Sequence, residues 1–172
     1  AFARALAALP AEGGVLRAGT GTYLLTASGD RPRRGLELSG RKNIALVGDG
    51  MANTTLKLAP GDYSTGSDTH LVFVEAADGI TFRDLTFDGN LRGSTWSQRD
   101  EHRHCVAIWS PSSDLVFERV RFYNCRGDGI FLVGSLTGGD DWIDGVRVEH
   151  AVFEDNGRSG IAVQRGVRRL DI

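Results

Sequence analysis

A short two-strand pattern recurs along this chain, and it limits the fold more than any other feature. Segment 114–133 contains two apolar stretches, Leu115–Phe122 and Ile130–Val133, joined by a turn rich in Asn, Cys, Gly and Asp. Copies of the first stretch occur at 79–90 and 145–156, and copies of the second at 104–109 and 159–164, with a looser copy at 69–74. Each copy is therefore one unit of a repeated structure.

The spacing of these units indicates a coiled stack of strands. The centre of the second stretch recurs 24 residues after Val106, at Ile130, and 31 residues after that, at Ile161; the extra length lies in the Gly-rich insertion 134–142. Repeats of this size cannot bury their apolar face alone, so they stack into a solenoid. The units are strand-sized and show no helical period, which predicts an all-β solenoid with ladders of equivalent residues about 4.8 Å apart.

Alternation along each stretch separates inward from outward side chains. The aligned copies place Ile80, Leu115 and Val146 in one inward column. Phe87, Phe122 and Phe153 form another. The remaining core is expected to contain Leu36, Leu38, Ile44, Leu46, Leu56, Leu58, Leu71, Phe73, Phe82, Leu85, Val106, Ile108, Phe117, Val120, Ile130, Leu132, Val148, Ile161, Val163 and Leu170.

The turns after the Phe column hold Asn and Cys. We expect Asn90 and Asn156 to adopt a left-handed backbone there, which Asn tolerates, and to be structural. Cys125 shares their column, whereas Cys105 precedes a strand, so the two cysteines are assigned to different corners of the coil. Isolated buried thiols are the expected state, with a disulfide as the alternative.

The beginning of the chain is typical of a solenoid cap. Segment 1–9 places apolar residues at helical spacing before Pro10, which predicts a short helix covering the apolar end of the stack. We assign residues 1–35 to this cap and the first strands, and residues 36–172 to coils of the same domain. Because the strand pattern continues to Ile172, we expect further coils and a C-terminal cap after it.

Overall charge and hydropathy exclude some partner classes. The chain has 20 basic and 22 acidic residues, and its net charge of -2 shows no nucleic-acid footprint. It also has no run of about 18 apolar residues that would span a bilayer. We therefore expect neither nucleic acid nor a membrane as partner.

The order of elements near the N-terminus resembles a known superfamily. A predicted helix is followed by GGVLRAG (13–19), GTYLL (21–25), LELSG (36–40), NIALVGDG (43–50) and TTLKL (54–58). This order is similar to the start of pectate-lyase-like right-handed parallel β-helices, among them pectate lyases, polygalacturonases, mannuronan epimerases and phage tailspike depolymerases. The resemblance covers nearly the whole chain and implies a single-stranded right-handed parallel β-helix. It implies polysaccharide chemistry only in general terms, because the fold hosts several reactions.

The candidate catalytic residues stand just before the second stretch of each unit. This position holds His104, Asp128 and Ser159 in successive coils, so His104 and Asp128 should be ladder neighbours. A carboxylate beside an imidazole raises the imidazole pKa and orients the ring as an acid or base. We therefore assign Asp128 and His104 as catalytic.

The candidate substrate-binding residues face outward from the same strands. Trp109 and Phe131 offer adjacent apolar planes on which sugar rings could stack. On the following coil, Arg158 and Gln164 add a positive charge and an amide. These four residues complete the predicted site.

Each assignment has a structural alternative. Asp128 precedes Gly129, and Asp in that setting often bonds its own backbone in a turn. His104 ends the charged segment 99–104, which is typical of a solvated loop. The insertion 134–142 or a protein partner could cover Trp109 and Phe131.

Comparison with particular families identifies matches and departures. Asp128 in GDGI matches the first Asp of a TDGI-like polygalacturonase pattern, but RSGI at 158–161 lacks the Asp pair and the GHG that follow it there. Inverting hydrolysis needs a second carboxylate. Asp100, Glu101 or an acid after Ile172 are the candidates.

The motif of mannuronan epimerases, similar to YGFDPHE, differs more strongly from the sequence at this strand. Its Tyr, catalytic Asp and His align with Asp128, Phe131 and Val133. This predicts that the coil does not perform closely similar epimerase chemistry.

Pectate lyases bind Ca²⁺ through clustered carboxylates and use an Arg as base. Asp140, Asp141 and Asp144 surround the insertion, and Arg158 and Arg165 lie on the next coil. Oxygen ligands suit Ca²⁺, but GGDD is also typical of an exposed turn. We expect no cofactor, with Ca²⁺ only in the case of a lyase.

Two functions are therefore predicted. The first is a glycoside hydrolase or polysaccharide lyase that binds an extracellular polysaccharide along the stacked strands. The second is a non-catalytic stalk or glycan-binding segment of a tailspike or surface protein. Both place the protein outside the cell or at the cell surface, and an uncapped solenoid end is compatible with a homotrimer.

Overall fold

The computed structural model describes residues 2–29, 32–64, 68–97, 101–135 and 141–172. These residues form an α-helix, α1 (Phe2–Ala7), a 3-10 helix, η1 (Leu91–Gly93), and a series of short strands. The strands are β1 (Gly14–Arg17), β2 (Gly21–Leu25), β3 (Arg33–Glu37), β4 (Ile44–Val47), β5 (Thr54–Leu58), β6 (Asp62–Tyr63), β7 (Thr69–Glu75), β8 (Thr81–Asp88), β9 (Thr95–Trp96), β10 (Val106–Trp109), β11 (Ser112–Tyr123), β12 (Ile130–Val133), β13 (Ile143–Glu149), β14 (Val152–Glu154), β15 (Ile161–Arg165) and β16 (Val167–Asp171).

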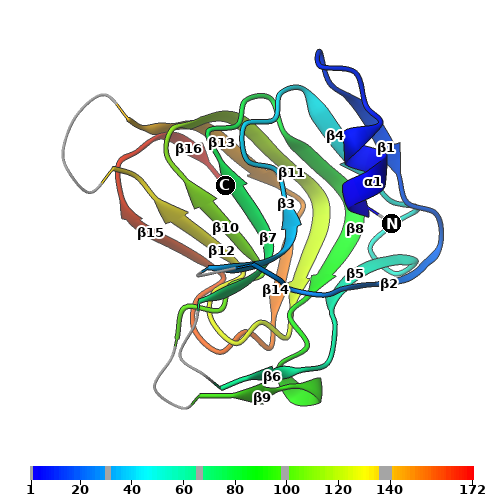
Figure 1. The fold of residues 1–172 in the computed structure, drawn as a ribbon. Helices are drawn as coiled ribbons and strands as arrows, with labels where there is room; N and C mark the ends of the chain where they lie inside the picture. The colour runs from blue at the N-terminus through cyan, green and yellow to red at the C-terminus, as the bar shows by residue number, and fades with distance from the viewer. Residues whose placement is uncertain (1, 30–31, 65–67, 98–100, 136–140) are drawn as a thin grey trace.

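The strands stack into the predicted right-handed parallel β-helix (Figure 1). The larger sheet follows the order β1-β4-β8-β11-β13-β16, with β2, β5 and β14 beside this path. The smaller sheet follows the order β15-β12-β10-β7-β3. In the middle coils one long strand takes the place of two short ones. For example, β4 pairs with the first half of β8, and β5 pairs with its second half.

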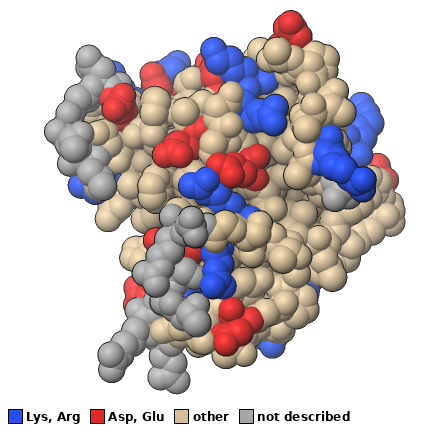
Figure 2. Space-filling view, viewed as in Figure 1, with Lys and Arg blue, Asp and Glu red and all other residues tan. Residues whose placement is uncertain are grey.

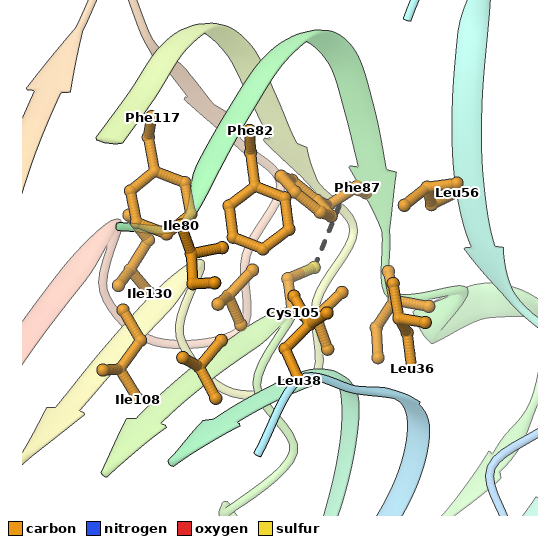
Figure 3. Packing of buried hydrophobic residues seen from close by; sticks show 14 of the residues in the cluster. Leu36, Leu38, Leu56, Ile80, Phe82, Phe87, Cys105, Ile108, Phe117 and Ile130 are labelled. Atoms are coloured by element: carbon orange, nitrogen blue, oxygen red, sulfur yellow. Dashed lines mark hydrogen bonds between the residues drawn. The ribbon is translucent and has the colours of Figure 1, made fainter. Parts of the chain in front are cut away.

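The strand register confirms the columns expected from the sequence. Phe122 pairs with Phe87 on one side and with Phe153 on the other. The ring centroids of these pairs are 5.1 and 4.9 Å apart, close to the spacing between stacked strands. Phe82 and Phe117 stack in the same way at 5.1 Å, and Figure 3 shows these rings beside the buried Ile80, Ile108 and Ile130. The core is therefore a set of ladders that runs through the coils.

One register prediction is wrong. The sequence alignment matched Leu71 to Val106, whereas Val72 is the residue paired with Val106. The shift by one residue puts Phe73 opposite Ala107, on the outer face of the smaller sheet rather than in the core. Phe73 is nevertheless fully buried, because Arg34 lies over its ring at 4.3 Å and Trp109 packs edge-on at 5.4 Å.

Left-handed residues mark the bends of the coil. Gly13, Asn43, Gly79, Asp114, Gly145 and Arg169 occupy equivalent positions in successive coils and all have positive φ. Asn90 also has the expected left-handed backbone, with φ of 53°, and its Nδ2 donates to the carbonyl of Leu58 at 2.9 Å. On the last coil the left-handed residue is Asp155 rather than Asn156. Asn156 still bonds the coil before it, through Nδ2 to the carbonyl of Phe122 at 3.2 Å.

The prediction of two free thiols is wrong, because Cys105 and Cys125 form a disulfide. Their Cα atoms are 5.5 Å apart, within the range that a disulfide requires. Cys125 begins the corner that leads into β12, and Cys105 ends the same corner one coil earlier. The sequence alignment treated these as different corners, although the stacking of coils brings them face to face.

Removing this disulfide should lower stability substantially. The bridge closes a loop with a sequence separation of 20 residues, which corresponds to about 3 kcal/mol of lost unfolded-chain entropy. We expect the Cys105→Ala/Cys125→Ala variant to unfold at correspondingly lower denaturant concentration. Wild-type protein unfolded in the presence of a reductant is the matched control. It should unfold at the same denaturant concentration as the variant. Equal midpoints for oxidised wild type and variant would contradict the stabilising role.

The N-terminal helix packs against the first coil as a cap. Leu6 of α1 is buried in the core, and Phe2 packs edge-on against Tyr23 at 5.4 Å. The first strands, which the sequence assigned together with the cap to residues 1–35, stack on the next coil. β1 and β2 already pair in register with β4 and β5, and residue 35 lies inside β3.

Charged side chains of both signs lie next to one another on the face shown in Figure 2. Many form exposed ion pairs between neighbouring coils. Arg119 contacts both carboxylate oxygens of Asp84 at 2.6 and 3.1 Å, and Arg169 contacts Asp144 at 2.6 Å. Such exposed pairs contribute little individually, so the ladders of the core carry most of the stability.

Candidate functional site

A cavity of about 410 Å³ lies on the outer face of the smaller sheet. It is lined by Asp68, His70, His102, His104, Trp109, Ser110, Phe131, Val133, Gly134, Ser135, Asp141 and Gln164. Four of the six predicted site residues are in this lining: His104, Trp109, Phe131 and Gln164. The stacking of β7, β10, β12 and β15 brings them together from different coils.

Asp128 and His104 are ladder neighbours, as predicted. Asp128 is in contact with the His104 ring through two groups: its backbone N–H donates to Nδ1 at 3.0 Å, and its carboxylate Oδ2 lies 3.1 Å from the same nitrogen. The other carboxylate oxygen, Oδ1, accepts the backbone N–H of Ser159 at 2.9 Å. Asp128 is therefore tied to the coils on both sides of it.

This geometry allows His104 two protonation patterns. When Nδ1 accepts the Asp128 N–H, the ring proton is on Nε2. When Nδ1 carries a proton, Oδ2 of Asp128 is placed to accept it, and Oδ2 has no other partner in the described residues. Nε2 likewise has no partner there, and the ring borders the cavity. The pair can thus hold a proton on either ring nitrogen.

Burial reverses the expected pKa shift of His104. The side chains of His104 and Asp128 are both 0% exposed. Burial lowers the pKa of His104 below its usual value, and the Asp128 carboxylate only partly offsets this. For Asp128, burial raises the pKa, but hydrogen bonds from His104 and Ser159 outweigh it and leave the pKa below its usual value. The Asp128 carboxylate thus acts on the His104 pKa in the predicted direction, but burial outweighs it, and the predicted contact is confirmed.

The two predicted aromatic residues have different surroundings. Phe131 is only 9% exposed and stacks on the His104 ring at 4.1 Å. Trp109 is half-buried, and its Nε1 has no partner in the part of the chain that the structure describes. Gly134, Ser135 and Asp141, at the two ends of the insertion, also line the cavity. Trp109 is thus the accessible aromatic surface, and Phe131 covers the buried histidine.

Arg158 is placed beside the pair rather than in the cavity. Its Nε lies 3.8 Å from Oδ1 of Asp128 and 3.6 Å from a carboxylate oxygen of Glu101. A direct contact of Arg158 with a substrate in the cavity is therefore not supported, although its charge helps to keep the pKa of Asp128 low.

No family model matches this chain. Mannuronan C5-epimerase AlgE6 of Azotobacter vinelandii is 35% identical to it over 128 residues, which are 72% of this chain and 14% of that protein. The solved A-module of mannuronan C-5 epimerase AlgE4 from the same organism superposes with a TM-score of 0.57 at 23% identity, over 93% of this chain and 46% of that chain. The AlgE6 A-module gives a TM-score of 0.50 at 23% identity, over 95% of this chain and 53% of that chain.

This chain belongs to the superfamily of pectate-lyase-like right-handed parallel β-helices. The chain spans about half of the length of each A-module and 14% of the length of the AlgE6 protein.

Three titratable residues of the cavity were missed by the sequence alignment: Asp68, His70 and His102. The one-residue shift in β7 hid His70, which stacks on His104 at 5.4 Å. Asp68 and His102 lie in loops outside the repeat, where alignment carries no signal. Their backbones are joined to neighbouring coils, as in the 3.3 Å bond from the Thr69 N–H to the His102 carbonyl.

The predicted carboxylate cluster for Ca²⁺ is divided in the β-helix. Asp140 lies outside the described residues. Asp141 lines the cavity, whereas Asp144 borders a separate groove and pairs with Arg169. Among the described residues, no group of three His, Cys, Asp or Glu side chains is arranged to hold a metal ion. Use of Ca²⁺ stays a prediction.

The β-helix should lose stability in acid because of His70. Burial, together with the charges of His104, His102, Arg34 and Arg103, holds the pKa of His70 well below its usual 6.5. Below pH 6.5 His70 binds a proton in the unfolded chain but stays unprotonated in the folded chain. The free energy of unfolding is therefore unaffected by His70 above pH 6.5. It decreases as the pH falls below 6.5, by up to about 1.4 kcal/mol per pH unit.

His70→Phe tests this acid sensitivity. Phe keeps the ring stacking and removes the titrating nitrogens, neither of which has a partner in the described residues. We expect thermal midpoints measured at about pH 7.5 and about pH 5.5 to differ less than in wild type. The exposed His150, changed to Asn, is the control and should leave the pH dependence unchanged. An identical acid loss in wild type and His70→Phe would exclude His70 as the cause.

Proposed function

We propose that this β-helix is part of an enzyme that processes a polysaccharide, as a glycoside hydrolase or polysaccharide lyase. The observation that carries the proposal is the His104–Asp128 pair bordering a cavity that also contains Trp109 and Gln164. The named relatives are enzymes that act on mannuronan, which supports a polysaccharide as the substrate.

The role of each residue follows from its position. His104 exchanges a proton through Nε2, and Asp128 orients the ring and balances its charge at Nδ1. Trp109 supplies a face for a sugar ring, and Gln164 supplies both a donor and an acceptor. In hydrolysis the imidazole moves a proton between water and the glycosidic oxygen. In elimination it takes the proton from the carbon beside a carboxylate.

A second candidate is a non-catalytic glycan-binding segment of a surface protein. The observation that favours it is the complete burial of the His104 and Asp128 side chains, with Phe131 stacked over the imidazole. Catalysis requires this cover to move, whereas binding to Trp109 does not.

Product release decides between these candidates. The full-length protein is incubated with acidic and neutral polysaccharides, with and without Ca²⁺, while reducing ends and the ultraviolet absorbance of unsaturated products are followed. We expect products in at least one of these channels. Reducing ends without absorbance indicate hydrolysis, and both together indicate elimination. Retained binding without any product would replace the enzyme by the second candidate.

Trp109 should dominate the affinity for the glycan. We expect Trp109→Ala to weaken binding by about tenfold, because the variant loses the half-exposed aromatic face. Trp142→Ala is a matched control, since Trp142 lies outside the cavity and packs on Arg168 at 3.7 Å. Isothermal titration with the bound polysaccharide measures both. Equal losses in the two variants would place the binding site elsewhere.

An oxidising compartment fits the proposed location outside the cell or at its surface. The Cys105–Cys125 disulfide is of a kind that persists mainly in secreted and surface proteins. No helix in the described ranges has the length and apolar character needed to cross a bilayer. The homotrimer stays a prediction.

A further inference from the structure

The charges around the cavity are unbalanced. Two carboxylates, Asp68 and Asp141, line it, and the described lining contains no Lys or Arg. Two of its three histidines, His70 and His104, are held uncharged near neutral pH by burial. Among the described residues, a ligand in the cavity therefore meets two carboxylates and no lining Lys or Arg.

Two guanidinium groups near the histidines are engaged by acids, and a third, that of Arg103, is buried and donates to the Thr69 hydroxyl at 3.1 Å. Arg34 contacts Glu37 at 2.5 Å and lies over the Phe73 ring. Arg158 lies between Asp128 and Glu101. The charges of Arg34 and Arg158 are balanced by acids within the protein, and Arg103 is not part of the described cavity lining, so these groups offer little to an anionic ligand.

The polar groups of the cavity suit hydroxyl groups. Nε1 of Trp109 and Nε2 of His104 are buried and have no partner in the described residues, and both rings line the cavity. His70, 2% exposed, also has two ring nitrogens without partners. Carboxylates accept from sugar hydroxyls, while an indole N–H donates to their oxygens. Leaving such buried groups without partners is costly, which indicates a ligand that completes them.

From this arrangement we propose that the cavity binds a sugar unit without a carboxylate, so that the substrate is an uncharged polysaccharide rather than a polyuronate. The inference rests on the proposed function and narrows it. Elimination removes a proton from a carbon that a neighbouring carboxylate makes acidic, and an uncharged sugar has none. The reaction at this cavity is then hydrolysis. Water supplies the hydroxyl on the anomeric carbon and the proton on the departing oxygen.

This substrate differs from that of the named relatives, which act on mannuronan. A uronate carboxylate in the cavity would lie near Asp68 and Asp141, and like charges brought together in a binding site lower affinity strongly. We expect an uncharged oligosaccharide to bind at least about tenfold more tightly than the polyuronate of the same stereochemistry.

A matched pair of ligands tests the inference. Oligosaccharides of β-1,4-mannan and of mannuronan share linkage and ring stereochemistry and differ at carbon 6, which bears a hydroxyl or a carboxylate. A corresponding pair is pectic galacturonan and its carboxyl-reduced form. Binding of each ligand to the full chain is measured by titration at low and high salt.

Asp68→Asn/Asp141→Asn is the decisive variant. It should bind the polyuronate at least about tenfold more tightly than wild type does, and the gain should shrink as salt screens the charges. Asp144→Asn is the control, because Asp144 lies outside the cavity and pairs with Arg169. It should leave the preference unchanged.

Each outcome has a distinct meaning. Preference for the uncharged member, relaxed in the double variant, supports the inference. Equal or tighter wild-type binding of the polyuronate overturns it and leaves the proposed function standing. Tight binding of polyuronate by wild type with loss in the double variant would assign the two carboxylates to another role. If neither member of either pair binds, the proposed function fails, and the inference fails with it.

Discussion

Asp128→Asn is expected to slow glycan cleavage by about 10²–10⁴-fold while leaving glycan binding nearly unchanged. The Asn side chain has the same size and can still accept the backbone N–H of Ser159. Its amide, however, donates to Nδ1 of His104 where the carboxylate would accept. This locks the ring proton on Nε2 and removes the charge that stabilises the imidazolium, so His104 can no longer exchange protons in both directions.

The pH profile separates this role from a structural one. The Asp128 carboxylate raises the pKa of His104 against the larger lowering by burial. Without that carboxylate the pKa of His104 falls further, so the acidic limb of the rate profile should move to lower pH. A residue that only shapes a turn would leave this limb in place.

Ser159→Ala is the matched control for Asp128→Asn. Only the backbone N–H of Ser159 contacts Asp128, so removing its hydroxyl should change neither the rate nor the profile. Unfolding midpoints of all variants identify any loss of rate that comes from unfolding. Full turnover in Asp128→Asn would show that Asp128 is a turn residue and would remove the pair from the proposed mechanism.

Phe122→Ala should cause the largest loss of stability, about 3–5 kcal/mol. Phe122 is fully buried and stacks between Phe87 and Phe153. Its removal leaves a cavity at a point where three coils meet, and a solenoid depends on the contacts between neighbouring coils. Denaturant unfolding should show a lower midpoint.

Phe153→Ala is the comparison for this prediction. Phe153 ends the stack, is only half-buried and contacts Phe122 on one side. Phe153→Ala should lower the free energy of unfolding by about half as much as Phe122→Ala does, because its removal exposes less apolar area to water. An equal or larger loss for Phe153→Ala would mean that the stack does not transmit stability through the middle coil.

The repeat determined the fold and part of the candidate site. Strand period and unit spacing are properties of neighbouring residues, and stacking converts them directly into ladders. The alignment therefore placed His104 beside Asp128 and Trp109 next to Val133, and both placements are confirmed. Such contacts follow from register, so a close repeat is sufficient to predict them, whereas the looser copy in β7 was misplaced by one residue.

What lies over a ladder depends on the tertiary structure. Outward-facing Phe73 and His104 are buried because side chains from other coils and loops cover them, and no local pattern encodes that cover. The direction of the His104 pKa shift follows from this burial, and so it was missed.

The repeat also did not predict the contacts made by loops and corners. Asp68 and His102 enter the cavity from segments without a repeat, and Cys105 meets Cys125 only because successive coils cross the same corner. The sequence by itself determined which residues stack. The tertiary structure decided which of them are covered, paired or charged, because burial and electrostatics depend on distances between segments far apart in the chain.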